Sequence, residues 1–289
     1  PWDVILSDAD ARGLVRGSRM NLRSLVTDRG AEPVIQSVVD AARQVRPTVV
    51  VLSTVTQGGI RLPVERIVAR ILEFSRGDPP LVVLDGCQAF GRVETDLGKG
   101  QLARVPCAYI GCFHKAMRGP KGMGFLVCND ASWRRTLNAL RSKGSDWPDL
   151  AEYGRSNGTH LAMPTHAVDR VVGAAASMEG VKRADLRSRE LRVTINHIAL
   201  ERGLVATDWK VVTPSHADWR SGIVLLQPPI ALPSAHRHAR KEALEDAASG
   251  GLVVDELRGM IRVALDPEHP ADEGGDLAKR LANAISELP

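Results

Sequence analysis

Lys115 is the residue whose sequence surroundings most favour covalent chemistry. It follows an apolar run at residues 108–111, comes directly after His114, and precedes a glycine-rich turn at residues 119–124. A lysine amine held at the end of a strand can act as a nucleophile toward a carbonyl group. A lysine taken alone is more often a surface residue, so the neighbouring segments decide between the two interpretations.

A carboxylate and an amide occupy a comparable position upstream. Asp85 ends the apolar run at residues 81–84, and Gln88 lies three residues further on. Beside an aromatic cofactor, such a carboxylate can hold a ring nitrogen in its protonated form. Alone, Asp85 would more often cap a helix, and an Asp-x-x-Gln pattern has little specificity. The order and spacing of Asp85, Gln88 and Lys115 are therefore more informative than any one of these residues.

The segments that must position these residues alternate between strand and helix patterns. Apolar residues recur at helical spacing over residues 32–45 and 63–72, and buried-strand patterns cover residues 4–6, 48–52, 81–84, 108–111 and 124–128. This alternation predicts an α/β fold with a mostly parallel sheet flanked by helices. Because ligands of such sheets bind at the carboxyl ends of the strands, residues 53–57, 85–88 and 112–115 are the candidate site segments.

The pattern changes in the last part of the chain. Residues 164–203 are predicted to be helical, with one apolar stripe that includes Val171, Val172 and Met178. Strand patterns follow at residues 210–213, 222–226 and 260–265, and helical patterns at residues 234–248 and 272–287. We therefore predict a large domain at residues 1–170, and a linking helix with a smaller C-terminal α+β domain at residues 171–289.

Two segments at the predicted strand ends carry a family resemblance. Residues 84–89 read Leu-Asp-Gly-Cys-Gln-Ala, and residues 114–126 read His-Lys-Ala-Met-Arg-Gly-Pro-Lys-Gly-Met-Gly-Phe-Leu. They resemble the D-G-A-Q and H-K-x-x-x-G-P-x-G-x-G-F-L signatures of class V aminotransferase-type enzymes, which include cysteine desulfurases, kynureninases and isopenicillin-epimerase-like proteins. The resemblance implies fold type I with pyridoxal 5'-phosphate (PLP) as cofactor.

The resemblance also implies a role for each residue at these strand ends. Lys115 would form a Schiff base with PLP and then move protons at the α-carbon of an amino-acid substrate. Asp85 would pair with the pyridine nitrogen, and Gln88 would hydrogen-bond the phenolic oxygen of the ring. His114 would support the phosphate or the ring. Gln57 stands where the family usually has asparagine, near the ring and the substrate carboxylate.

Three more positions receive a role in the same way. Cys112 occupies the place of a phosphate-binding serine in many family members, although a thiol is a poorer donor to phosphate. Thr159 resembles part of a Gly-Thr segment that reaches the cofactor phosphate of the neighbouring subunit, which implies a homodimer with shared active sites. Arg262, in a segment that resembles Ile-Arg-Val, would bind the substrate α-carboxylate through its planar guanidinium group.

Departures from the family pattern leave two hypotheses open. The N-terminal phosphate-binding loop of the family is not found, so we expect that segment to lie outside this sequence, and residues 7–12 contain no aromatic residue to stack on the ring. No cysteine follows Cys128, which argues against persulfide chemistry. One hypothesis is an active aminotransferase or a carbon–carbon or carbon–sulfur lyase. The alternative is a catalytically degenerate PLP-fold protein, or half of a split assembly with a scaffolding role.

Composition narrows the class of protein further. The formal charge of +4 is spread along the 289 residues without a basic tract, so nucleic-acid binding is not expected. No apolar run is long enough for a membrane span, and no signal peptide opens the sequence. The four cysteines fall between residues 87 and 128 without a C-x-x-C pair. We therefore expect buried free thiols, no metal site and a cytoplasmic location.

Overall fold

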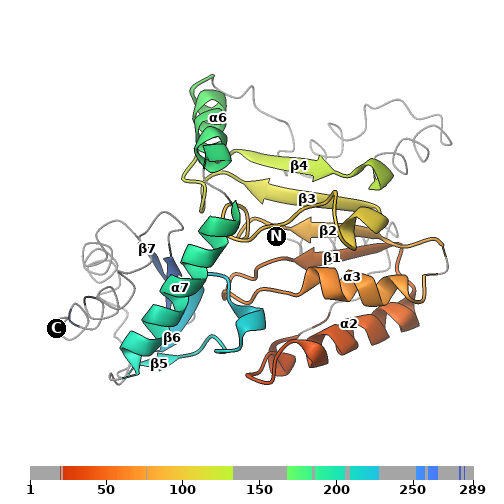
Figure 1. Ribbon diagram of the computed structural model, residues 1–289, viewed down its shortest axis with the longest axis horizontal. Coiled ribbons are helices and arrows are strands. Elements are labelled where there is room, and N and C mark those ends of the chain that lie inside the picture. The colour runs from red at the N-terminus through yellow and green to blue at the C-terminus, as the bar shows by residue number, and fades with distance from the viewer. Residues whose placement is uncertain are drawn as a thin grey trace, which may run out of the picture.

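A four-stranded sheet forms the centre of the protein in the computed structural model, which describes residue 20, residues 22–75, 77–132, 168–183, 186–205, 209–227, 252–257 and 260–265, and residues 280 and 283. Its strands lie in the order β1 (Val49–Ser53), β2 (Leu81–Asp85), β3 (Cys107–Cys112) and β4 (Gly124–Cys128) (Figure 1). β1, β2 and β3 run parallel, and β4 is antiparallel to β3. The predicted α/β fold with a mostly parallel sheet is confirmed.

Two helices, α2 (Glu32–Val45) and α3 (Val64–Leu72), lie side by side and pack on this sheet (Figure 1). Both are amphipathic, and the apolar face of each is buried among the side chains of β1 and β2. Proline starts each helix, where its missing N–H leaves no hydrogen bond unmade. α2 matches the predicted bounds, because its periodicity ends where Arg46 turns into the left-handed region at φ 49° ahead of Pro47.

A second sheet is antiparallel throughout, with the strand order β5 (Lys210–Val211), β6 (Ile223–Gln227), β8 (Met260–Leu265) and β7 (Leu252–Leu257). It lies beyond the carboxyl ends of β1, β2 and β3, to which their arrows point in Figure 1. The predicted strand at residues 260–265 coincides with β8. The predicted strand at residues 4–6 and the predicted helices at 234–248 and 272–287 lie outside the described residues.

Short 3-10 turns occur at η1 (Arg23–Leu25), η2 (Leu102–Arg104) and η3 (Ala217–Trp219). η3 holds the two sheets together. The indole of Trp219 is fully buried in the core of the first sheet, and its Nε1 donates to the carbonyl of Thr27 at 2.8 Å. The Ser221 hydroxyl donates to the carbonyl of Gly59 at 2.6 Å. These contacts fix the second sheet against the loop that follows β1.

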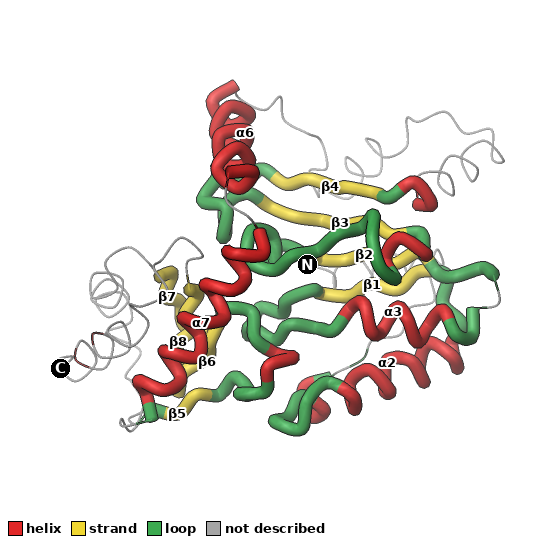
Figure 2. Tube along the Cα trace, viewed as in Figure 1, coloured by secondary structure: helices red, strands yellow, loops and turns green. Residues whose placement is uncertain are grey.

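Two helices connect the sheets, α6 (Val168–Arg183) and α7 (Leu186–Leu204), and α7 packs against β5 and β8 (Figure 2). The helices were predicted, but their apolar stripes are not buried: Val172 is 60% exposed and Leu191 is 59% exposed. α7 instead buries a mixed face of Arg189, Val193, Asn196, His197, Leu200 and Leu204. None of the described helices is both long and apolar enough to cross a membrane.

Candidate active site

The end of β2 and the end of β3 bring four reactive side chains together: Asp85, Cys87, Cys112 and Lys115, here called the Lys115 cluster. Asp85 is the last residue of β2 and lies beside Ile110 of β3. The amide of Gly86 donates to the Ile110 carbonyl at 2.8 Å, which extends the pairing one residue beyond the strand. The Cys87 amide donates to Asp85 Oδ1 at 3.1 Å and orients that carboxylate.

The two thiols of the Lys115 cluster interact with each other, and neighbouring charged groups shift their pKa values. Cys112 Sγ donates to the Cys87 carbonyl at 3.5 Å. A hydrogen bond from the Cys87 thiol lowers the pKa of Cys112 to about 7, and the Lys115 ammonium group acts in the same direction. The same bond, burial and the Asp85 charge raise the pKa of Cys87. Cys112 is therefore the more acidic thiol of the pair and is partly ionised at neutral pH.

A tight turn presents Lys115 at the end of β3. The amide of Gly119 donates to the Phe113 carbonyl at 2.7 Å, and the amide of Arg118 donates to the Lys115 carbonyl at 2.9 Å. A Cβ atom on Gly119 would lie 2.7 Å from the Phe113 Cβ, so the turn requires glycine there. His114 is exposed on the same turn. Partial burial and the ammonium groups of Lys115 and Lys121 lower the pKa of His114, which leaves its imidazole uncharged at neutral pH.

Arg262 reaches the same end of the sheet from β8 and makes two contacts there. Its Nε donates to the Gln57 carbonyl at 2.8 Å, and its Nη2 donates to Gln88 Oε1 at 3.0 Å. Arg262 is 7% exposed, so these bonds are shielded from water. Gln57, Gln88 and Arg262 are here called the Arg262 cluster. Gln57 takes part through its main chain, whereas its predicted role involved the side chain.

Two further buried arginines surround the Arg262 cluster, and the sequence patterns did not single them out. Arg92 Nε donates to the Leu265 carbonyl at 3.3 Å, and Arg189 Nε donates to the Gly91 carbonyl at 3.1 Å. Burial lowers the pKa of Arg92 to about 10, and the nearby guanidinium groups of Arg262 and Arg189 contribute. The only signal for Arg92 was its place four residues after Gln88. Positive charge is therefore concentrated where the two sheets meet.

The side chain of Tyr109 explains why residue 86, in the segment 84–89, is a glycine. Its hydroxyl donates to the Gly86 carbonyl at 3.3 Å, and burial raises its pKa. A Cβ atom on Gly86 would lie 1.9 Å from the Tyr109 ring. Only glycine fits at that position, which keeps the turn between Asp85 and Gln88 close to the sheet.

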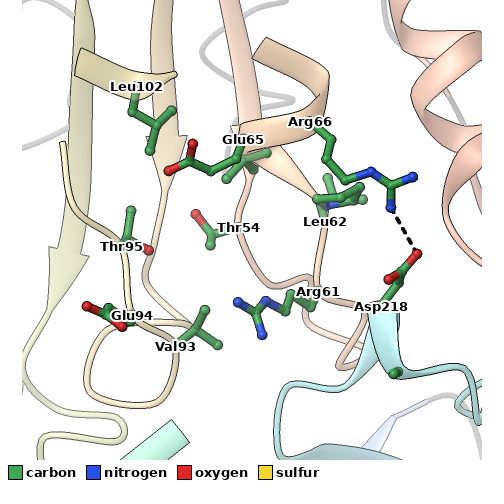
Figure 3. Close-up of a pocket in the computed structure, with 13 residues that line it drawn as sticks. Thr54, Arg61, Leu62, Glu65, Arg66, Val93, Glu94, Thr95, Leu102 and Asp218 are labelled. Carbon is green, nitrogen blue, oxygen red and sulfur yellow. Dashed lines mark hydrogen bonds and ion pairs between the residues drawn. The ribbon is translucent and has the colours of Figure 1, made fainter. Parts of the chain in front are cut away.

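A separate cavity of ≈ 360 Å³ opens between the loop after β1, the start of α3 and residues 93–102 (Figure 3). None of the residues predicted for the site lines it. Both arginines that line it are paired: Arg61 with Glu190 at 2.6 Å, and Arg66 with Asp218 at 3.1 Å. The Lys115 and Arg262 clusters therefore remain the better candidates for chemistry.

The predictions for Thr159, the cysteines and a metal site have different outcomes in the structure. Thr159 lies outside the described residues. Cys107 and Cys112 are buried and all four thiols are free, but the prediction of a buried thiol is wrong for Cys128, which is exposed on β4, and Cys87 is only partly buried. No group of three or more His, Cys, Asp or Glu side chains among the described residues is arranged to hold a metal ion.

Comparison with known proteins places the fold. No family model and no curated protein matches the chain. A ureidoglycine–glyoxylate aminotransferase from Bacillus subtilis matches with a TM-score of 0.63 at 15% identity, over 87% of this chain and 64% of that chain. A cysteine desulfurase from Thermococcus onnurineus matches with a TM-score of 0.61 at 15% identity, over 91% and 65%. This chain has the fold of the PLP-dependent enzymes of fold type I.

A third fold type I structure adds a bound cofactor to the comparison. A serine palmitoyltransferase from S. paucimobilis with a bound PLP–myriocin aldimine matches with a TM-score of 0.54 at 17% identity, over 87% of this chain and 59% of that chain. The present chain thus spans about 64% of the length of the first of these relatives. The structural neighbours are class V aminotransferase-like and related PLP enzymes, as the motifs at residues 84–89 and 114–126 predict.

Proposed function

We propose that this chain binds PLP at the Lys115 cluster and acts on an amino-acid substrate, as an aminotransferase or as a carbon–carbon or carbon–sulfur lyase. The observation that carries the proposal is that Asp85 ends β2 and Lys115 follows β3, with both charges acting on Cys112, while the buried Arg262 reaches Gln88 after β2. Asp85 and Lys115 come from parallel neighbours of one sheet, and Arg262 comes from the other. A binding site between two such units can close on a small substrate.

The residues present fit the cofactor by their chemistry. The Asp85 carboxylate, oriented by the Cys87 amide, suits the protonated nitrogen of the pyridine ring. Lys115 supplies the primary amine that binds the PLP aldehyde. The neutral His114 lies on the Lys115 side of the site and would hold the phosphate end, with Cys112 in its protonated thiol form and Thr159 as further proposed ligands. When bound, PLP would supply an electron sink for negative charge at the substrate α-carbon.

The Arg262 cluster would bind the substrate. A guanidinium group that is 7% exposed and already near Gln88 can form two charge-assisted hydrogen bonds with a carboxylate. The repulsion among Arg262, Arg92 and Arg189, which contributes to the lowered pKa of Arg92, is relieved when an anion enters. Gln57 and Gln88 would hold the anion-binding group in place. Lys115 would then take the proton from the α-carbon and return it.

The chain would act as a homodimer in a reducing compartment such as the cytoplasm. Apolar side chains of α6 and α7 are exposed in the single chain, among them Val171 at 49%, Val172 at 60% and Leu191 at 59%. An exposed apolar surface of this kind is typical of a contact with another subunit. The four cysteines are free, as expected where disulfides do not persist.

Reduction with borohydride tests the proposal directly. The protein is incubated with PLP, its visible absorbance is recorded, and the mixture is reduced and digested. We expect a PLP-dependent visible band and a pyridoxyl group on the peptide that contains Lys115. The neighbouring Lys121, exposed on the same turn, is the internal control and should stay unmodified. A spectrum that ignores PLP, or label spread evenly over lysines, contradicts PLP binding and favours the degenerate, scaffolding alternative.

A further inference from the structure

Two of the four cysteines meet where β2 and β3 end. Asp85 and Ile110 are register partners, and the Gly86 amide continues the pairing at 2.8 Å. Cys87 follows in the turn after β2, and Cys112 is the last residue of β3. Cys112 Sγ donates to the Cys87 carbonyl at 3.5 Å, so the thiol of one cysteine contacts the main chain of the other. This contact brings the two residues within reach of a disulfide, which needs Cα atoms about 4.4–6.8 Å apart.

The side chains are placed for the same bond. Cys112 Sγ lies 3.5 Å from the Cys87 carbonyl, and the two thiols hydrogen-bond each other. Cys112 is buried, and Cys87 is partly exposed, which opens the pair to a small oxidant. We propose that Cys87 and Cys112 are a redox modification site, and that a peroxide converts them to a reversible disulfide beside Asp85 and Lys115.

The chemistry needs one peroxide molecule for each disulfide. The Cys112 thiolate, present in quantity because its pKa is lowered to about 7, attacks a peroxide oxygen and breaks the O–O bond. With hydrogen peroxide, this gives a sulfenic acid on Cys112, and the leaving hydroxide takes up from solvent the proton that Cys112 released on ionisation, which makes the first water. The Cys87 thiol then attacks the Cys112 sulfur, the S–O bond breaks, and the departing hydroxide takes the Cys87 proton to leave as the second water. Two thiols are oxidised and hydrogen peroxide is reduced to two waters.

The other two cysteines provide a natural control. Cys128 on β4 is the register partner of Ala108, so its side chain shares a face of the sheet with Ala108. Cys107 precedes Ala108 and points to the opposite face. Cys107 is also fully buried, which raises its pKa to about 12. These thiols are close along the strands but cannot form a bond through the sheet.

The bond would act on the proposed cofactor site through Asp85, and this consequence rests on the proposed function. The Cys87 amide holds Asp85 Oδ1 at 3.1 Å, so a bond that moves Cys87 disturbs the carboxylate. The disulfide also consumes the Cys112 thiol next to Lys115. We expect oxidation to weaken PLP binding about tenfold, which corresponds to the loss of one ordinary hydrogen bond.

The test treats the whole chain with hydrogen peroxide at neutral pH, with circular dichroism recorded to show that it stays folded. Non-reducing peptide mapping by mass spectrometry then identifies linked cysteines. We expect a Cys87–Cys112 linkage that dithiothreitol reverses, in the parent chain and in Cys128→Ser. Cys87→Ala and Cys112→Ser should each lack the linkage, and oxygen should accumulate on Cys112 in Cys87→Ala but not on Cys87 in Cys112→Ser, because the pKa of Cys87 is raised. PLP titrations before oxidation, after it and after dithiothreitol measure the coupling.

The outcomes separate the two proposals. A folded parent chain that forms no Cys87–Cys112 linkage, or that links Cys107 to Cys128 equally well, overturns the redox site. A linkage that leaves the PLP titration unchanged overturns its effect on the cofactor. A chain that forms the linkage but never binds PLP contradicts the proposed function and leaves the thiol pair intact as a modification site, because the mass measurement does not depend on PLP.

Discussion

The Lys115 cluster and the Arg262 cluster meet at the same end of the sheet but are built in different ways. The Lys115 cluster lies at and just beyond the ends of two adjacent parallel strands, whose pairing brings those ends together. The Arg262 cluster joins residues that are 205 and 174 positions apart, through contacts between two sheets. The first therefore depends on pairing within one sheet, and the second depends on how the second sheet is docked. Changes to the two clusters should have separable effects.

Their electrostatics differ in the same way. The Lys115 cluster combines a carboxylate, a thiolate and an ammonium group, which favours proton transfer and covalent chemistry. The Arg262 cluster is cationic and buried, and burial together with the neighbouring arginines lowers the pKa of Arg92 to about 10. Such a region favours binding of an anion and contributes no proton acceptor. Substitutions in the Lys115 cluster should therefore lower the turnover rate, whereas substitutions in the Arg262 cluster should weaken substrate binding.

Replacing Lys115 should have the largest effect. Lys115→Ala removes the only amine proposed to bind PLP covalently and to move the α-proton. We expect turnover to fall by about 10³-fold or more, in the upper range for loss of a general base, while noncovalent PLP binding is partly retained. Steady-state rates and the visible absorbance of the PLP complex measure the two effects. Lys121→Ala, on the same turn, is the matched control, and an equal loss there would remove the special role of Lys115.

Replacing Arg262 should affect the substrate more than the rate. Arg262→Lys keeps the charge but loses the planar fork that contacts Gln57 and Gln88. We expect KM for the amino acid to rise about tenfold to 100-fold, the range for charge-assisted hydrogen bonds, with a smaller change in kcat. Arg43→Lys on the exposed face of α2 is the control. A pure loss of kcat would show that Arg262 acts on the reaction and not on binding.

The sequence predicted the Lys115 cluster better than the Arg262 cluster for a physical reason. Strand-helix alternation predicts parallel neighbours, and parallel strands place their carboxyl ends together, so Asp85 and Lys115 could be grouped in advance. Cys87 was missed because its contact with Cys112 depends on the path of the turn after β2, which the apolar pattern does not reveal. Arg92 was missed because one arginine after a glycine carries no distinguishing pattern before the sheets are docked.

Periodicity was also incomplete for the connecting helices. The spacing of Val171, Val172 and Met178 predicts correctly that they share a helix face. It does not show what that face contacts, and these side chains are exposed in the single chain. α7 buries Arg189 and His197 instead. A helix can therefore be predicted from its period while its orientation depends on contacts that no local pattern records.

Gly86 offers a smaller, structural test of the Lys115 cluster. Gly86→Ala places a methyl group 1.9 Å from the buried Tyr109 ring, so we expect a loss of about 1–3 kcal/mol in the free energy of unfolding. Gly180→Ala in α6 meets no atom within 4 Å, and we expect it to gain about 0.5–1 kcal/mol from helix propensity. Urea unfolding with constant m-values compares them. If Gly86→Ala and Gly180→Ala change the free energy of unfolding equally, then the turn after Asp85 can move away from the sheet without cost.

The smallest expected effect is a shift in the pH dependence of one thiol. The pKa of Cys112 is lowered from 9.0 to about 7, first by the Cys87 thiol and then by the Lys115 ammonium group. Since the thiolate is the reactive form, its alkylation rate should rise with pH and reach half its plateau near pH 7. Removing either helper destabilises the thiolate, so Cys87→Ala and Lys115→Ala should each move the midpoint upward, Cys87→Ala further. Peptide mapping after brief iodoacetamide pulses follows Cys112 separately from Cys128. If neither substitution moves the midpoint, then neither the Cys87 thiol nor the Lys115 ammonium group stabilises the Cys112 thiolate. The residues of the Lys115 cluster would then be close in space without being electrostatically coupled.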